Sequence, residues 1–358
     1  MPNRDRHISR RKALQTTAAL GVTGVLAGCL GGDDNGDDGD DGNGDDANGD
    51  DANGEEATPW GDVITSTPEI IIPYGPGGGT DTYARAFQGP MRELADQTIE
   101  ISNVPGAATF NGVGQMLQAE PDGLTVAIVN LPATALNDLV QEPDLPVQDM
   151  VPMAQFAVDP LVWCANPDEG LRHDPEEMIA RFEDGTYTAT GGVGPGTPET
   201  HAIAARNVGI PWEDYIRYDG TGNAIQAIAS GEISVGLPSM GGALGPIEEG
   251  TIEPVMMATG IQSSALPDVP LFTDVFDQDI TFVSQVTRGF YAPPGTPDEV
   301  VDAWEELVRE TLEHPEVVEW QEDTGQDITY GDRDVLGDVF FGMYEDLPDL
   351  VDLSEFDN

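Results

Sequence analysis

The chain has 358 residues and a formal net charge of −52 at pH 7, with 66 acidic residues against 14 lysines and arginines. Lys12 is the last lysine, so arginine alone supplies positive side chains to the rest of the sequence. Proteins that bind nucleic acids need a basic surface to neutralise phosphates, and this composition excludes that class.

The acidic residues have two interpretations. Twelve of them lie between Asp33 and Glu56, where they form a local tail of the kind that serves interactions. About fifty others are spread over the remaining chain, which favours an adaptation of the whole surface to concentrated salt. In molar salt the Debye length is about 3 Å, so repulsion between acidic side chains is screened. We therefore expect folding to be more stable at high salt.

Residues 1–29 have the pattern of an export signal. The basic pair Arg10 and Arg11 precedes an apolar segment of about fifteen residues that ends in Leu-Ala-Gly-Cys at Cys29. The paired arginines resemble a twin-arginine signal, and the last four residues resemble a lipobox, in which the cysteine is lipidated. A transmembrane anchor is the alternative, but it needs roughly twenty apolar residues. We expect an exported protein, held outside the cytoplasm on the cytoplasmic membrane by a lipid.

Within residues 30–61, the stretch 31–57 is almost purely Asp, Gly and Asn, with two glutamates, and has no apolar residue able to form a core. Such a composition predicts a disordered tether. The Gly-Asp-Asp repeats lack the nonapeptide spacing of calcium-binding repeats, so we expect at most weak association with cations.

After residue 61, strand-like and helix-like stretches alternate, which is typical of parallel sheets flanked by helices, and the length is sufficient for two lobes. We expect strands at residues 69–72, 98–101, 124–129, 154–165, 186–190, 215–218, 233–237 and 254–259. We expect helices at residues 80–94, 111–119, 175–182, 198–208, 223–230 and 297–314.

Three glycine-rich corners lead from a strand into a helix, at residues 74–81, 191–197 and 219–223. Glycines let backbone N–H groups face one point, and the positive end of the helix dipole lies at the same place. Such corners bind anions without lysine or arginine, and ligands of open α/β sheets bind at the carboxyl ends of strands. If the first two corners lie on different lobes, we expect them to close on an anion from opposite sides.

The corners belong to a set of five ordered motifs that resembles the solute-binding receptors of tripartite tricarboxylate transporters, the TctC or Bug family. The motifs are PYGPGGGTD at 73–81, NVPGA at 103–107 with PDGLT at 121–125, GPGTPETH at 194–201, YDG at 218–220 with GEISV at 231–235, and PGTP at 294–297. The chain departs from the family at Tyr74, usually phenylalanine, and at Pro238-Ser239, where the family often has an acid.

The resemblance implies a two-lobed α/β periplasmic-binding-protein fold of the second type, with two mixed or parallel sheets flanked by helices and a ligand cleft between the lobes. Lobe 1 would comprise residues 62–165 and 283–358, and lobe 2 residues 166–282. The ligand would be a small organic carboxylate, held largely by backbone amides, hydroxyls and water. The partners would be the large and small membrane subunits of a permease. We expect a monomer.

We expect the ligand to contact the three corners and two further strand ends. The candidate residues are Tyr74, Gly77, Gly78, Gly79, Thr80, Asp81, Asn130, Thr134, Gly194, Gly196, Thr197, Thr221, Gly222 and Ser239. Some have a structural alternative: the glycines can serve a tight turn only, and Asp81 can stabilise the start of its helix.

Other conspicuous residues have a structural interpretation. We interpret His201 as a packing or capping residue. Arg85, Arg217 and Arg288 are expected to pair with acids, the last two at the surface, although a buried arginine fork would recognise a carboxylate.

Catalytic signals are missing from the sequence. The four histidines are scattered, and neither metal-binding His and Cys spacings nor a Gly-x-Ser-x-Gly nucleophile motif occurs. We therefore predict no enzyme, no metal and no cofactor, and interpret Cys164 as a buried hydrophobic residue. A ligand-sensing adaptor that docks on a membrane sensor and transports nothing remains an alternative function.

Overall fold

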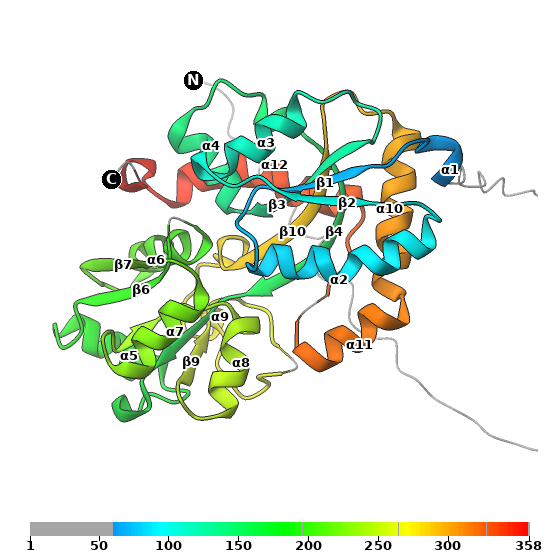
Figure 1. Cartoon of the computed structure of the whole chain (residues 1–358). Helices are drawn as coiled ribbons and strands as arrows, with labels where there is room; N and C mark the ends of the chain where they lie inside the picture. Colours follow the sequence, from blue (N-terminus) through cyan, green and yellow to red (C-terminus); the bar gives the residue numbers. More distant parts are fainter. Residues whose placement is uncertain (1–59, 195, 264, 327, 357–358) are drawn as a thin grey trace, which may run out of the picture. The chain divides into compact units, whose positions relative to one another are not determined.

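The computed structural model describes residues 60–194, 196–263, 265–326 and 328–356, which all belong to one compact unit (Figure 1). The predicted export signal, including Arg10, Arg11 and Cys29, lies outside the described residues, as does nearly all of the predicted tether. Within the described part of the chain, no helix combines the length and the hydropathy that a membrane span requires.

A five-stranded mixed sheet organises the first part of the fold. Its strand order is β2-β1-β3-β10-β4, where β1 is Glu69–Ile72, β2 is Glu100–Asn103, β3 is Thr125–Leu131, β4 is Val151–Pro160 and β10 is Gln285–Ala292. β1 is parallel to β2 and β3, whereas β10 lies antiparallel between β3 and β4. A strand from late in the sequence is therefore inserted between two strands from early in the sequence.

Helices cover both faces of this sheet, and the side chains of β1 are accordingly buried on both sides. Ile70 and Ile72 belong to a core cluster with Phe87 and Trp304, whereas Ile71 between them packs into the cluster on the other face. Successive side chains of a strand point to opposite faces, so a strand buried on both sides must be apolar throughout. The helices are α1 (Trp60–Val63), α2 (Gly79–Leu94), α3 (Phe110–Leu117), α4 (Ala133–Gln141), α10 (Asp298–Glu313), α11 (Pro315–Thr324) and α12 (Arg333–Leu350).

The second part of the fold holds two smaller sheets. In the first, β8 (Val235–Gly236), β5 (Val162–Ala165) and β9 (Glu253–Met257) are antiparallel; in the other, β6 (Ala189–Val193) and β7 (Asp214–Tyr218) are parallel. A bridge between Gly192 and Leu237 joins them. The surrounding helices are α5 (Pro175–Glu183), α6 (Thr197–Val208), α7 (Thr221–Ser230), α8 (Met240–Glu248) and α9 (Phe272–Val275).

The chain crosses between the two parts at neighbouring points. The single strand expected at 154–165 is two strands, β4 and β5, which belong to different sheets and are separated by Leu161. Leu161 N–H donates a 2.9 Å hydrogen bond to the carbonyl of Ser284, which directly precedes β10. The outgoing and returning crossings are therefore bonded to each other.

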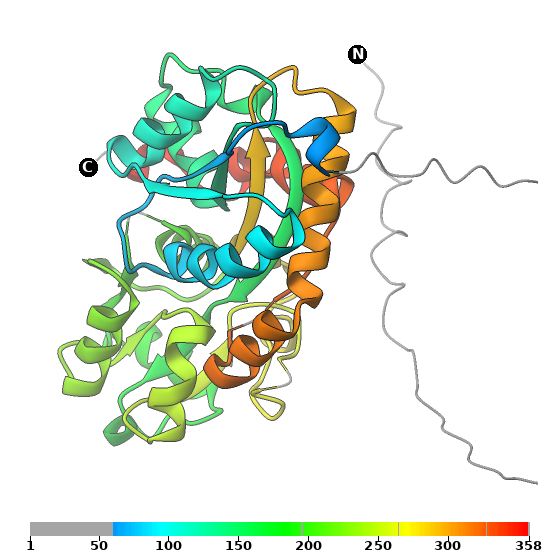
Figure 2. The same ribbon diagram turned by 45° about the vertical axis from the view of Figure 1, so that its right-hand side comes forward.

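The C-terminal part of the chain also reaches the second part. Figure 2 shows α10 and α11 along one side of the molecule, with α11 beside α8. A methyl group added at Gly325, directly after α11, would lie 3.5 Å from Leu244 Cδ1 of α8.

At the other end of the described chain, α1 begins inside the segment expected to be the tether. The ring of its Trp60 packs edge-on against Trp304, with 5.1 Å between the ring centroids.

Candidate functional site

The first glycine corner joins β1 to α2 and exposes its backbone. Residues 75–79 are exposed, Gly77 has a φ of +80°, and Gly78 is the N-cap of α2 without a side chain that could cap the helix. A sixteen-residue helix therefore begins at the carboxyl end of β1 with an exposed N-cap and an exposed first residue, Gly79, and without a capping side chain. This is the geometry that accepts an anion.

Asp81 holds this corner in shape. Its Oδ2 accepts hydrogen bonds from Gly77 N–H at 2.8 Å and Arg85 Nε at 2.9 Å, and its Oδ1 accepts one from Asn103 Nδ2 at 3.0 Å. Burial opposes ionisation of Asp81, but these hydrogen bonds outweigh it and hold its pKa below the usual range. The expected pairing of Arg85 with an acid is confirmed, and Asp81 has a structural role whatever else it contacts.

A second network joins the corner to the end of β3. Thr80 Oγ1 and the Asn130 side chain exchange hydrogen bonds at 2.9 and 3.1 Å, and Asn130 N–H donates to the hydroxyl of Tyr74 at 2.9 Å. That hydroxyl lies 3.5 Å from Thr134 Oγ1, and burial raises the pKa of Tyr74. The structure thus brings together eight predicted site residues: Tyr74, Gly77, Gly78, Gly79, Thr80, Asp81, Asn130 and Thr134.

The starts of α7 and α8 form another group. A methyl group at Gly242 would lie 2.6 Å from Thr221 Cγ2 and 3.6 Å from Ser239 Oγ, so these two predicted residues are neighbours. Gly222 follows in the first turn of α7 and is exposed. This group connects toward the first sheet because Asp159 Oδ1, near the end of β4, accepts a 3.2 Å hydrogen bond from Gly241 N–H.

Arg288 pairs with an acid, as expected, but the pair is buried, so the expected location at the surface is wrong. The residue is 6% exposed, and its Nη2 lies 3.5 Å from Oδ2 of Asp159, which is 4% exposed. Arg288 lies in β10, between β3 and β4 of the first sheet, which explains the burial.

The glycine corner before α6 has a different environment. A methyl group at Gly194 would lie 2.7 Å from Arg217 Cγ and 2.8 Å from Glu199 Oε2, so only glycine fits beside this ion pair. Arg217 Nη2 lies 2.8 Å from Glu199 Oε1, which confirms that Arg217 pairs with an acid, although Glu199 is buried and not at the surface as expected. Gly196 is the N-cap of α6, and Thr197 is buried in its first turn. Pro195 lies outside the described residues, so contact between this corner and the α2 corner stays a prediction.

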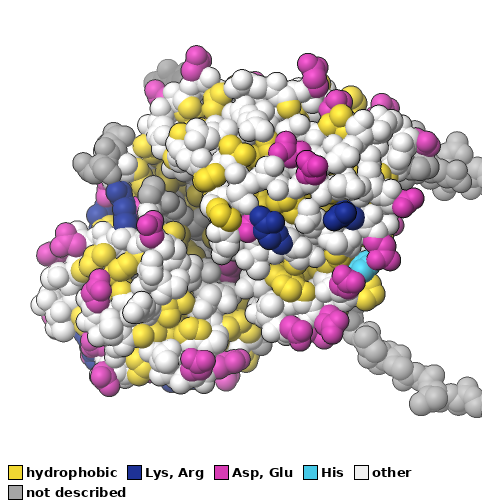
Figure 3. All heavy atoms as spheres, in the orientation of Figure 1, with side chains coloured by type: hydrophobic (Ala, Val, Ile, Leu, Met, Phe, Trp, Pro, Cys, Tyr) yellow, Lys and Arg dark blue, Asp and Glu magenta, His cyan; other side chains and the backbone are white. Residues whose placement is uncertain are grey.

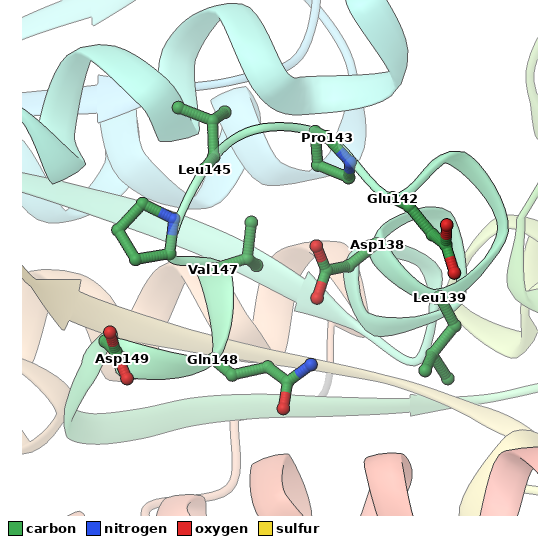
Figure 4. Close-up of a pocket in the computed structure, with 9 residues that line it drawn as sticks. Asp138, Leu139, Glu142, Pro143, Leu145, Val147, Gln148 and Asp149 are labelled. Carbon is green, nitrogen blue, oxygen red and sulfur yellow. The ribbon is translucent and has the colours of Figure 1, made fainter.

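Two pockets of the described residues lie away from the α2 corner. One, of about 390 Å³, is lined by Asp138 and Leu139 of α4 and by residues of the segment that follows, among them Glu142, Leu145 and Gln148 (Figure 4). Burial raises the pKa of Asp138 there. The other, of about 770 Å³, adjoins the Glu199–Arg217 pair beside β7. The surface is also hollowed between the part that carries β1 and the part that carries β6 and α7, as Figure 3 shows.

The remaining polar residues of interest have structural roles. His201 is fully buried between Trp163 Nε1, which donates to its Nε2 at 3.1 Å, and Ser284 Oγ, 2.7 Å from its Nδ1. This confirms its interpretation as a packing residue. Cys164 is fully buried, as expected, and burial raises the pKa of its thiol. Among the described residues, no group of three His, Cys, Asp or Glu side chains forms a metal site.

Sequence reasoning missed two residues of the corner region, Asn103 and Asp159. Asn103 stands in a recognised motif, but only the fold shows that its amide reaches both Asp81 and the carbonyl of Tyr74. Asp159 could have been found from the sequence, because it is an acidic residue inside the apolar run that crosses between the sheets.

The chain resembles known proteins along most of its length. The model of the tripartite tricarboxylate transporter family receptor, TctC, matches residues 83–338. A UPF0065 protein of Bordetella pertussis is 26% identical over 269 residues, which cover 74% of this chain and 82% of that protein. Protein BugT of the same organism is 24% identical over 264 residues, covering 70% and 78%.

Solved structures show the same fold. A TctC solute-binding protein from Polaromonas superposes with a TM-score of 0.69 at 19% identity, covering 80% of this chain and 98% of that one. MatC from Rhodopseudomonas palustris, solved with bound malate, has a TM-score of 0.65 at 21% identity, covering 81% and 100%.

The fold is that of the periplasmic binding proteins, with mixed sheets flanked by helices, as expected. The chain belongs to the TctC family of tripartite tricarboxylate transporter receptors. Members of this family are solute-binding proteins that act outside the cytoplasm, so the prediction that the chain is not an enzyme is confirmed by its family.

Proposed function

We propose that this protein captures a small di- or tricarboxylate and delivers it to the membrane subunits of a tripartite tricarboxylate-type permease. The observation that carries the proposal is the exposed start of α2, where uncapped backbone amides lie next to the hydroxyl and amide groups of Thr80 and Asn130. The backbone amides and the second N–H of the Asn130 side chain are donors for carboxylate oxygens at a helix N-terminus, whereas the hydroxyl proton of Thr80 is donated to Asn130 Oδ1. Two structures of the same fold, MatC and Rpa4515 of Rhodopseudomonas palustris, contain malate and adipate.

In this proposal the ligand lies between two lobes. Lobe 1 comprises residues 62–165 and 283–358 and lobe 2 residues 166–282, and the paired crossings at Leu161 and Ser284 act as the hinge. The α2 corner supplies contacts from one lobe. Gly194, Gly196 and Thr197 of the α6 corner, with Thr221, Gly222 and Ser239, supply contacts from the other.

The location and the assembly follow from the N-terminal pattern. Residues 1–29 direct export by the twin-arginine route, Cys29 carries the lipid, and the acidic segment after it tethers a monomeric receptor to the outer face of the cytoplasmic membrane. The tether leaves the receptor free to turn toward its permease.

The acidic surface shapes how the ligand arrives. Acidic side chains are scattered over the face that Figure 3 shows, in keeping with a net charge of −52. At low salt the electrostatic field of these acidic side chains repels an anionic ligand. Molar salt screens the field within about 3 Å, so that the affinity depends on the short-range hydrogen-bond donors of the site. We therefore propose that the receptor works in concentrated salt.

The test is to purify the exported protein without refolding and to identify any retained solute by native mass spectrometry. Calorimetric titration in about 3 M KCl, where the Debye length is shortest, then follows with malate, succinate, adipate and citrate. We expect binding of at least one of these carboxylates. A protein that carries no carboxylate and gives no heat with any of the four contradicts the proposal.

A further inference from the structure

Arg288 carries a buried guanidinium that its protein neighbours do not satisfy. The residue is 6% exposed, and its Nε and Nη1 are buried without a hydrogen-bond partner among the described residues. The acid beside it, Asp159, is 3.5 Å from Nη2, longer than a charge-assisted hydrogen bond. Burying unpaired donors of a charged group is costly, so such an arrangement is expected where another polar group completes it.

The guanidinium lies against the start of α2. In the sheet Arg288 stands opposite Asn130, whose side chain is bonded to Thr80. Its Cζ lies 5.2 Å from the centroid of the Tyr83 ring in the second turn of α2. A methyl group added at Gly79, the first residue of the helix, would be 3.3 Å from Arg288 Nη2. The guanidinium therefore adjoins the exposed first residue of α2.

The acid opposite Arg288 is shared with the second part of the fold. Asp159 Oδ1 accepts the hydrogen bond from Gly241 N–H at the start of α8, and Asp159 Oδ2 faces Arg288. The guanidinium and the positive end of the α2 dipole both place positive charge at the corner, beside the carboxylates of Asp159 and Asp81. An anionic oxygen at the corner would interact favourably with the guanidinium and with the dipole.

We propose that Arg288 is a ligand-binding residue that selects for negative charge. One carboxylate of the ligand sits at the start of α2 and accepts a hydrogen bond from Nη2 of Arg288, the guanidinium nitrogen next to Gly79, in competition with Asp159. This inference rests on the proposed function and adds to it that the recognised feature is the charge of the carboxylate. A site built from neutral donors alone, as the glycine motif would allow, would bind a carboxamide as well as a carboxylate, because both present acceptor oxygens.

The test compares three variants in calorimetric titrations with the tightest binder among malate, succinate, adipate and citrate. Arg288→Gln is expected to weaken binding by about tenfold to a hundredfold, the effect of losing a charged hydrogen bond. Asp159→Asn keeps an acceptor for Gly241 N–H but removes the competing charge, so binding should tighten by about threefold or more. Arg309→Gln is the matched control.

The control removes the same charge elsewhere. Arg309 pairs with Glu306 and Glu313 on α10, so its substitution changes the net charge equally and should leave affinity within about twofold. A folded Arg288→Gln protein whose affinity stays within that range overturns the inference but leaves the proposed function standing. If Arg288→Gln does not fold, Asp159→Asn decides: unchanged or weaker binding overturns the inference. A wild-type protein that binds none of the carboxylates contradicts the inference and the proposed function together.

Discussion

The backbone amide of Gly77 donates a 2.8 Å hydrogen bond to Oδ2 of Asp81, which ties the glycine corner to the first turn of α2. The same carboxylate binds Arg85 and Asn103, so one acid determines the position of the amides that face the proposed ligand. Removing its charge should therefore affect stability and ligand binding together.

Asp81→Asn is expected to lower the free energy of unfolding by about 1–3 kcal/mol, because the amide cannot accept all three hydrogen bonds. The pKa of Asp81 is held below its usual range, so its contribution is present at neutral pH and is lost as the pH falls through that depressed pKa. Urea unfolding between about pH 7 and pH 3 measures this. The exposed Asp338 on α12 provides the control, Asp338→Asn, and equal effects of the two substitutions would contradict the role of Asp81.

Gly77→Ala and Gly78→Ala should behave differently although they are neighbours. Gly77 has a φ of +80°, so alanine there is strained and should cost about 1 kcal/mol or more of stability. Gly78 has a φ of −77°, and an added methyl would meet only the carbonyl of Gly75 at 3.4 Å. Gly78→Ala should therefore keep its melting temperature but bind carboxylates at least about tenfold more weakly, because the methyl obstructs the ligand. Unimpaired binding by Gly78→Ala would place the ligand elsewhere.

His201 should make folding pH-dependent between about pH 5 and 7. Burial lowers its pKa to about 3, whereas an unfolded histidine titrates near about 6.5. The unfolded chain therefore binds the additional proton between these values, and the stability due to His201 is full above about pH 6.5 and falls below it. Relative to His201→Gln, the wild type should lose about 2 kcal/mol between about pH 7.5 and pH 5 in urea unfolding. Parallel stability curves for the two proteins would show that His201 is not buried in the neutral form.

Stability should rise with salt. With 66 acidic residues the folded state repels itself, and screening relieves this repulsion. A gain of about 2–3 kcal/mol between about 0.1 M and 3 M KCl would raise the melting temperature by roughly 5–10 °C. Calorimetric melting at both concentrations measures this, and equal melting temperatures would refute the adaptation to salt.

The elements around the first glycine corner were predictable from the sequence. The strand at 69–72 was expected with its observed bounds, and the helix expected at 80–94 begins one residue earlier, at Gly79. Both could be predicted because an apolar run, a glycine cluster and an amphipathic stretch follow one another in the sequence. We expected one strand at 154–165, whereas the structure has two strands there, β4 and β5. Continuous hydrophobicity marks burial but does not show that two sheets share the run, and the break at Leu161 is visible only in the pairing of the strands.

β10 and Arg288 show the limit of local reasoning. β10 pairs with β3 and β4, more than a hundred residues earlier, and its position inside the sheet depends on those distant partners. An arginine in that strand resembles any surface arginine in the sequence. Its burial follows from the sheet order, which no local pattern of the sequence contains.

The most direct measurement of the central claim is a crystal structure of the protein with a co-purified or added carboxylate. We predict a carboxylate group within hydrogen-bonding distance of the amides at Gly78, Gly79 or Thr80. A ligand that lies in another part of the molecule, with these amides bonded only to water, would contradict this claim.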